Sequence, residues 1–212
     1  MIIMSEQKNT APQGAVRTDN KVRSIAVTGV LSGVAFVLQL IEFAVPMFVP
    51  PFIKFDFSDL PALVGSYALG PLYGIAIEFI KNLIHVMFSG SFGVGELSNF
   101  LLGAVFVGVA GIIYQRNKTK NGAFIASLAG AIAMAAVSLP SNYFVVYPVY
   151  YNFMPEETIL KAYQLIMPSL KNIFECLLFI NVPFTFVKGM IDVAITFMIY
   201  KHISPILKGK TN

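Results

Sequence analysis

The sequence predicts an all-α integral membrane protein with six transmembrane helices, both termini cytoplasmic, and an apolar outer loop between helices one and two that covers a pocket. Of its 212 residues, 56% are hydrophobic and only 12% are charged, which is about half the charged share of a soluble domain. The mean hydropathy is +0.72. Apolar runs of about 20 residues, the length that crosses a bilayer, recur along the chain.

The chain divides into a polar cytoplasmic N-terminal tail (1–24), a six-helix membrane domain (25–207) and a cytoplasmic C-terminal tail (208–212). No short apolar run with a small-residue cleavage site follows the first tail, so we expect no removed signal peptide. No internal repeat is evident in the sequence, which indicates a single domain.

Four segments are predicted to span the membrane without interruption, and their residues are 25–45, 92–114, 122–151 and 172–200. The stretch 57–88 is ambiguous, because it would be long for a single helix and Gly70-Pro71 interrupts it. Proline lacks a backbone donor and clashes with the preceding turn, so a break is expected there. Two spans in this stretch also place the basic N-terminus, "RNKTK" and "KHISPILKGK" on one side, as the positive-inside rule prefers.

The second of the six predicted helices, which is the first span in this stretch, is expected to be short, roughly 57–69, with irregular backbone leading into it. The preceding segment "VPMFVPPFIKF" (45–55) is rich in proline and poorly suited to a helix. We interpret it as an apolar outer loop that folds over the mouth of the protein.

Five charged residues gather between positions 54 and 82, where hydrocarbon makes charge costly. They are Lys54, Asp56, Asp59, Glu78 and Lys81. Asp59 precedes a helix and is a candidate cap, with Ser58 as its competitor, and either aspartate could pair with Lys81. Glu78 and Lys81, three residues apart, are expected to tie helices together.

Catalytic and nucleotide-binding motifs are absent from the sequence. The only "GKT" lies at 209–211, where no helix can follow it, and there is no H-E-x-x-H or G-x-S-x-G. One cysteine, Cys176, excludes an intrachain disulfide and a multi-cysteine metal site. Ten of the 15 lysines and arginines lie in short segments at cytoplasmic ends, so the net charge of +4 does not indicate nucleic acid. We therefore expect no enzyme, no cofactor and no bound metal.

An apolar, aromatic interior with a few embedded polar groups is typical of a small-molecule pocket. The polar groups concentrate in the outer half of the predicted bundle. They are Lys54, Asp56, Asp59, Asn99, Asn142, Tyr143 and Lys188. Tyr147 and Phe144 are the aromatic residues expected to touch a flat ligand.

Four stretches of the sequence carry a family resemblance: "PPFIKFDFSDLPALVGSYALGPLYGIAIEFIKNLIH", "GELSNFLLGA", "NYFVVYPVY" and "PFTFVKG". Together they resemble the riboflavin-specific substrate-binding (S) component of energy-coupling factor (ECF) transporters, from about residue 25 to 207. The resemblance implies a prokaryotic plasma-membrane protein that captures riboflavin outside the cell. It also implies partners that drive transport, namely a transmembrane coupling subunit carrying two cytoplasmic ATPases.

The resemblance also implies specific ligand contacts. Members of the family bind the flavin ring with an Asn that corresponds to Asn142 and a Lys that corresponds to Lys188. Their second Asn corresponds to Thr185, whose single hydroxyl offers fewer hydrogen bonds than an amide. The family's outer loop covers the ligand, which would bring Lys54, Phe55 and Asp56 near it.

Some of these residues also have structural explanations. Asn142 could bond a neighbouring carbonyl, and Lys188 could pair with Asp192 four residues on. Gly29 and Gly33, with Ala26, form a small-residue face on the first helix. Such a face either packs inside the bundle or, as the resemblance implies, docks on the coupling subunit.

Two alternatives remain open from the sequence. The same scaffold could take another vitamin or a precursor, an alternative that the threonine at position 185 favours, or it could take the mononucleotide FMN. A solitary ion-coupled carrier would use embedded carboxylates as relays, although carriers are usually built from repeats. The candidate relay residues are Glu42, Glu96, Glu175 and Asp192.

Overall fold

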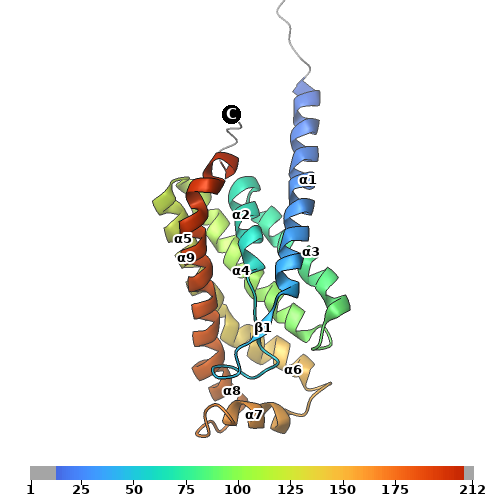
Figure 1. Cartoon of the computed structure of the whole chain (residues 1–212), viewed down its shortest axis with the longest axis vertical. Helices are drawn as coiled ribbons and strands as arrows, with labels where there is room; N and C mark the ends of the chain where they lie inside the picture. The colour runs from blue at the N-terminus through green and yellow to red at the C-terminus, as the bar shows by residue number, and fades with distance from the viewer. Residues whose placement is uncertain (1–12, 208–212) are drawn as a thin grey trace, which may run out of the picture.

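The computed structural model describes residues 13–207, and it is a bundle of long helices closed at one end by short ones (Figure 1). The predicted C-terminal tail (208–212) and positions 1–12 lie outside the described residues. The elements, in chain order, are α1 (Gln13–Leu40), β1 (Phe43–Ala44), β2 (Lys54–Phe55), α2 (Asp59–Leu69), α3 (Pro71–His85), the 3-10 turn η1 (Val86–Phe88), α4 (Val94–Arg116), α5 (Lys120–Ser141), the π turn η2 (Asn142–Val146), α6 (Tyr147–Tyr150), α7 (Glu156–Gln164), α8 (Ile173–Cys176), the π turn η3 (Leu177–Asn181) and α9 (Val182–Leu207).

Five stretches of helix are long and apolar enough to cross a membrane. They are Lys21–Leu40, Pro71–Phe88, Val94–Arg116, Lys120–Tyr150 and Ile173–Ile199. Each coincides with a segment expected to span, within a few residues at its ends. Helix α1 begins at Gln13, so the described part of the predicted N-terminal tail, residues 13–24, is helical.

The predicted break at Gly70-Pro71 is confirmed. Gly70 has a φ of +119°, which side-chain-bearing residues rarely adopt, and α3 starts directly at Pro71. Proline suits this position because the first helical N–H has no partner within the helix. Helix α2 before the break has 11 residues and is about 16 Å long, against about 30 Å of hydrocarbon.

The segment between α1 and α2 contains no helix, as its prolines predict. Its ends pair as a two-stranded antiparallel hairpin, with Phe43 opposite Phe55 and Ala44 opposite Lys54. These short strands were not predicted from the sequence. The hairpin and its loop lie across the end of α2, between α1 and α9 in Figure 1.

Two prolines explain the π turns that interrupt the last two long helices. Pro148 and Pro183 lack a backbone N–H, and the carbonyls four residues before them lie inside η2 and η3. Widening the helix there avoids a clash between the proline ring and that carbonyl. Each π turn carries an asparagine, Asn142 at the start of η2 and Asn181 at the end of η3.

The core has two parts. In the first, α2, α3, α4, α5 and α9 pack around Leu63, Ile77 and Phe106. Gly130 on α5 has no side chain, which lets α5 approach α4 closely. A side-chain carbon at this position would lie only 2.6 Å from the carbonyl oxygen of Phe106. The second part joins α6, α7 and α8 through Tyr163 and Leu177 and closes the end of the bundle opposite the described chain ends (Figure 1).

Candidate functional site

A cavity of about 250 Å³ lies where the hairpin loop, the start of α4, η2–α6 and α9 meet. Its lining combines apolar and aromatic side chains with 13 polar or charged residues out of 25, so it is more polar than the usual ligand pocket. Seven of the nine residues expected near a ligand line it. They are Lys54, Asp56, Asn99, Asn142, Tyr147, Thr185 and Lys188.

The other two expected residues, Phe55 and Tyr143, do not line this cavity. Side chains alternate along a strand, so Phe55 points away from the side that Lys54 and Asp56 share and packs against other aromatic rings. Tyr143 directly follows Asn142 on a helix, where successive residues face different directions. It is 41% exposed.

Charged groups at the base of the cavity form a connected network. The Lys188 ammonium lies 3.1 Å from Asp56 Oδ2 and 3.2 Å from Asp59 Oδ2. Asp59 also binds Lys81 at 2.6 Å, and Lys81 lies 2.8 Å from Glu78. The expected links of Lys81 to Asp59 and Glu78 are thus observed, and the network joins α9, the loop before α2, and α3.

The alternative pairing of Lys188 with Asp192 is not observed. Both carboxylate oxygens of Asp192 are buried and have no hydrogen-bond partner among residues 13–207. Lys188 instead binds Asp56, in the loop that covers the cavity, and Asp59, the first residue of α2. The cap predicted at Asp59 is also not found: Ser58 precedes the helix, and its side chain makes no capping bond.

Two asparagines, Asn142 and Asn181, form a less charged part of the lining. Asn142 accepts a hydrogen bond from Ser98 at 3.0 Å. Asn181 accepts one from the Tyr163 hydroxyl, which also bonds to Tyr147. Burial raises the pKa of Tyr163 well above 10, so this phenol keeps its proton and can donate.

Asn181 was not among the site residues predicted from the sequence. The sequence does contain a pattern that indicates this residue. Asn181, Thr185 and Lys188 are spaced i, i+4 and i+7, which places them on one face of a helix. All three line the cavity. An amide inside a long apolar run, on the same helix face as a lysine, could therefore have been predicted as a ligand-binding residue.

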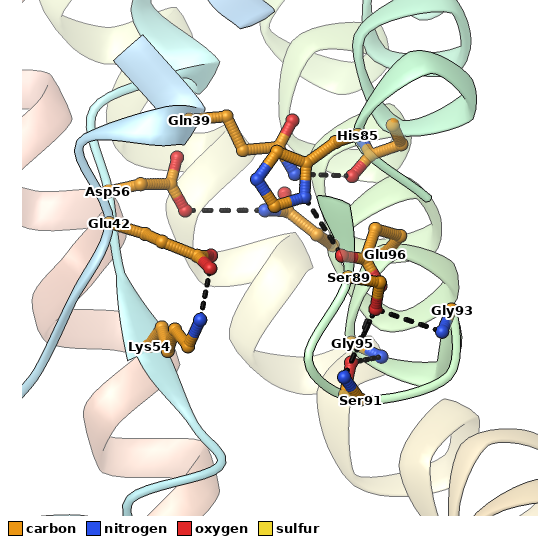
Figure 2. Close-up of polar contacts among 12 residues, drawn as sticks. Gln39, Glu42, Lys54, Asp56, His85, Ser89, Ser91, Gly93, Gly95 and Glu96 are labelled. Carbon is orange, nitrogen blue, oxygen red and sulfur yellow. Dashed lines mark hydrogen bonds and ion pairs between the residues drawn. The ribbon is translucent and has the colours of Figure 1, made fainter. Parts of the chain in front are cut away.

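A cluster of polar residues near the end of α1 and the start of α4 was also not predicted to line a ligand cavity (Figure 2). Gln39, Glu42 and Glu96 line the cavity here. Glu42 pairs with Lys54 across the hairpin. Glu96 accepts from His85 Nδ1 at 2.8 Å and from the Ser89 hydroxyl at 2.7 Å.

The small-residue face of α1 is exposed. Ala26, Gly29 and Gly33 all lie on the surface. Apart from its own stretch of helix, a side-chain carbon added at either glycine would meet no atom of the described part of the chain within 4 Å. Packing of this face inside the bundle, the structural alternative, is therefore not observed.

A bundle of membrane-length helices around a cavity lined by aromatic, amide and paired charged groups defines a multi-pass membrane protein of the small-molecule-binding class. Residues 23–200 match the family model for the substrate-specific component of the ECF transporter. This chain belongs to that family, whose members are transporter components and not enzymes.

Named relatives agree with this assignment. The chain is 31% identical over 186 residues to the riboflavin transporter RibU of Staphylococcus aureus (strain TCH60), covering 88% of this chain and 93% of that one. It is 30% identical over 188 residues to the riboflavin transporter FmnP of Bacillus subtilis (strain 168), covering 87% and 94%. A solved structure described as "Structure and mechanism of the S component of a bacterial ECF transporter" superposes with a TM-score of 0.69 at 29% identity, over 89% of this chain and 99% of that one.

Proposed function

We propose that this chain is the high-affinity riboflavin-binding subunit of an ATP-driven ECF importer in a prokaryotic plasma membrane. It captures riboflavin outside the cell and delivers it when coupled to a transmembrane subunit and two ATPases. The observation that carries the proposal is the shared face of Asn181, Thr185 and Lys188 in the cavity, in a chain about 30% identical to named riboflavin transporters.

The flavin ring system is flat, largely apolar, and has amide-like polar atoms along one edge. Asn142 and Asn181 supply amides that both donate and accept, Thr185 supplies a hydroxyl, and Lys188 supplies an ammonium. The aromatic side chains of Tyr147, Tyr150 and Phe184 line the same cavity and would pack against the ring faces. Phe55 and Tyr143 are left out of this set of contacts.

The proposed topology has six crossings with both chain ends in the cytoplasm. The short α2 completes its crossing with the irregular segment before it, which is tolerated in a membrane only where protein covers it or a cavity wets it. Asp56, in this segment, is buried against Lys188. The hairpin loop then lies on the outer side, above the cavity.

The exposed Ala26, Gly29 and Gly33 on α1 are the proposed contact with the coupling subunit. Small residues let the helix of a partner approach closely in a membrane, where van der Waals packing drives association. The side of this helix that faces the bundle is occupied instead by buried residues such as Ser32 and Ala35.

Reconstitution into vesicles tests the transport part of the proposal. The chain alone should bind riboflavin at the membrane and accumulate none inside, and uptake should require the coupling subunit, both ATPases and ATP. Accumulation by the chain alone, driven by an ion gradient, would instead support the solitary carrier. If the chain bound an unrelated vitamin as tightly as riboflavin, its assigned vitamin would change while its family would not.

A further inference from the structure

A second cavity, an apolar groove of about 640 Å³, lies between the hairpin segment and α9, beside the ligand cavity. All 14 residues that line this groove are apolar, and they come from 43–57, 166–167 and 179–191. The floor of the groove includes the buried Phe55 and Ile180, whereas Met47 and Phe179 at its rim are largely exposed. An open apolar surface of this kind marks a site for an apolar partner.

The groove lies at membrane depth. On the α9 side its lining is a stripe along one helix face, made by Phe179, Phe184, Val187 and Ile191. The stripe falls inside the membrane-length stretch Ile173–Ile199. With a rise of about 1.5 Å per residue it extends for about 18 Å, and one leaflet of the hydrocarbon core, half of about 30 Å, is about 15 Å thick. The groove is therefore long enough for the tail of a lipid in one leaflet.

The size of the lining side chains favours a lipid tail over a partner helix. Transmembrane helices approach one another through small residues, such as the exposed Gly29 and Gly33 of α1. The groove is lined instead by six phenylalanines together with isoleucine, valine, methionine and proline. A flexible hydrocarbon chain can follow so uneven a surface and contact each side chain, and many such contacts add up to a substantial dispersion attraction.

The groove and the ligand cavity share a wall. Phe184 lines both of them. Phe55 lines only the groove, whereas its chain neighbours Lys54 and Asp56 line the cavity. The rings of Phe55 and Phe184 meet edge to face with their centroids 6.3 Å apart. A molecule in the groove would therefore pack against the back of the ligand cavity.

We propose that the apolar groove binds one acyl chain of a membrane lipid, which supports the wall of the ligand cavity from outside. The lipid site stands on its own geometry, while its effect on riboflavin rests on the proposed function. A lipid tail that stabilises the closed wall tightens riboflavin binding, and riboflavin then tightens lipid binding by the same factor, because coupling between two sites is reciprocal.

The sequence contains no tryptophan, so one introduced indole reports on a single position. The full-length Phe179→Trp variant is dissolved in a sterol-based detergent, which has no acyl chain to compete for the groove. It is then titrated with phosphatidylcholine brominated on its acyl chains. Tryptophan quenching should saturate at one lipid per chain. The control reporter Phe79→Trp, on α3 and half exposed, lies outside the groove and should be quenched only gradually, with no saturation at that ratio.

A second substitution fills the groove. Val187→Phe, added to Phe179→Trp, should abolish the saturating quenching because a larger side chain occupies the space of the lipid tail. Val37→Phe on α1 is the matched control, since Val37 is 54% exposed and Val187 is 53% exposed. If Val187→Phe does not fold, Ile191→Phe in the same stripe takes its place.

Unbrominated phosphatidylcholine tests the link to the ligand cavity. One equivalent per chain should tighten riboflavin binding about fivefold, the lower end of typical coupling between sites, in the wild type and in Val37→Phe. The same lipid should leave riboflavin affinity unchanged in Val187→Phe.

Alike, non-saturating quenching of the two reporters would overturn the lipid site, as would unaltered saturation in the variant with the filled groove. Riboflavin affinity that lipid leaves unchanged in the wild type would overturn the support of the cavity wall. A wild-type chain that binds no riboflavin would refute the proposed function, and the quenching titration would still decide whether the groove holds a lipid tail.

Discussion

The ammonium of Lys188 lies 3.1 Å from Asp56 Oδ2, although the two residues are 132 positions apart in the chain. Asp56 belongs to the segment that covers the cavity, and Lys188 belongs to α9, which forms its wall. Their side chains are 2% and 11% exposed, so the pair is largely shielded from water. The ion pair therefore connects closure of the cavity to a residue proposed to touch the ligand.

Replacing Lys188 with methionine should weaken riboflavin binding at least about tenfold, the size of one lost charge-assisted hydrogen bond. The substitution removes a proposed ring donor and leaves Asp56 and Asp59 without one of their cations. A fluorescence titration measures the change. Lys171→Met, at an exposed position, should bind like the wild type. Unchanged affinity in Lys188→Met would remove this lysine from the ligand site.

Lys81 is expected to matter for stability. It is 0% exposed, lies 2.6 Å from Asp59 and 2.8 Å from Glu78, and does not line the cavity. Removing one member of a buried ion pair leaves an uncompensated charge, so Lys81→Met should lower the free energy of unfolding by about 3–5 kcal/mol. Denaturant unfolding in detergent measures this. A loss no larger than that of the exposed control Lys161→Met would contradict it.

Acid should leave binding unaffected until the pH is low. Asp56 is 2% exposed, and its Oδ2 lies 3.1 Å from the ammonium of Lys188. A positive charge this close favours the ionised form of a carboxyl, so Asp56 should stay ionised and paired as the pH falls from neutral. Riboflavin affinity should therefore stay constant between about pH 7 and about pH 5.

Titrations at several pH values across this range test the expectation. A decline that begins near neutral pH and is absent in Asp56→Asn would show that Asp56 titrates at a much higher pH than its ion pairs allow.

Substitutions on the exposed face of α1 should separate binding from transport. The first side-chain carbon of a leucine at Gly29 or Gly33 would meet nothing within 4 Å beyond its own stretch of helix, among residues 13–207, so riboflavin binding should persist. A bulky residue would keep a partner helix from approaching closely, so ATP-dependent uptake by the assembled transporter should fall. Val30→Leu, at a position already 67% exposed, is the control. Full uptake by both glycine variants would place the coupling interface elsewhere.

The long helices could be predicted because membrane crossing imposes a length and an apolar composition on each. The break at Gly70-Pro71 followed equally from local chemistry. Helix α7 was not predicted, although the sequence offers two acidic residues after Pro155, since the segment is short and joins the fold only through contacts of residues such as Tyr163.

The cavity was harder to predict than the helices. Asn142, Thr185 and Lys188 came from a family resemblance, and the structure brings them to one cavity. Asn181 and Gln39 were missed because an amide in an apolar run gives no sign of which way it faces. The partner of Lys188 was also uncertain, since Asp192 lies one helical turn away in sequence while Asp56 approaches only through the folded loop.

The most direct test of the central claim is a fluorescence titration of riboflavin with the purified full-length chain, alongside Asn142→Ala and Lys188→Ala. The account predicts saturable quenching by the wild-type protein at one flavin per chain, and marked weakening in both variants. Riboflavin fluorescence that the wild-type protein leaves unchanged would contradict the assignment of riboflavin as its ligand. Wild-type affinity in both variants would contradict the location of the site.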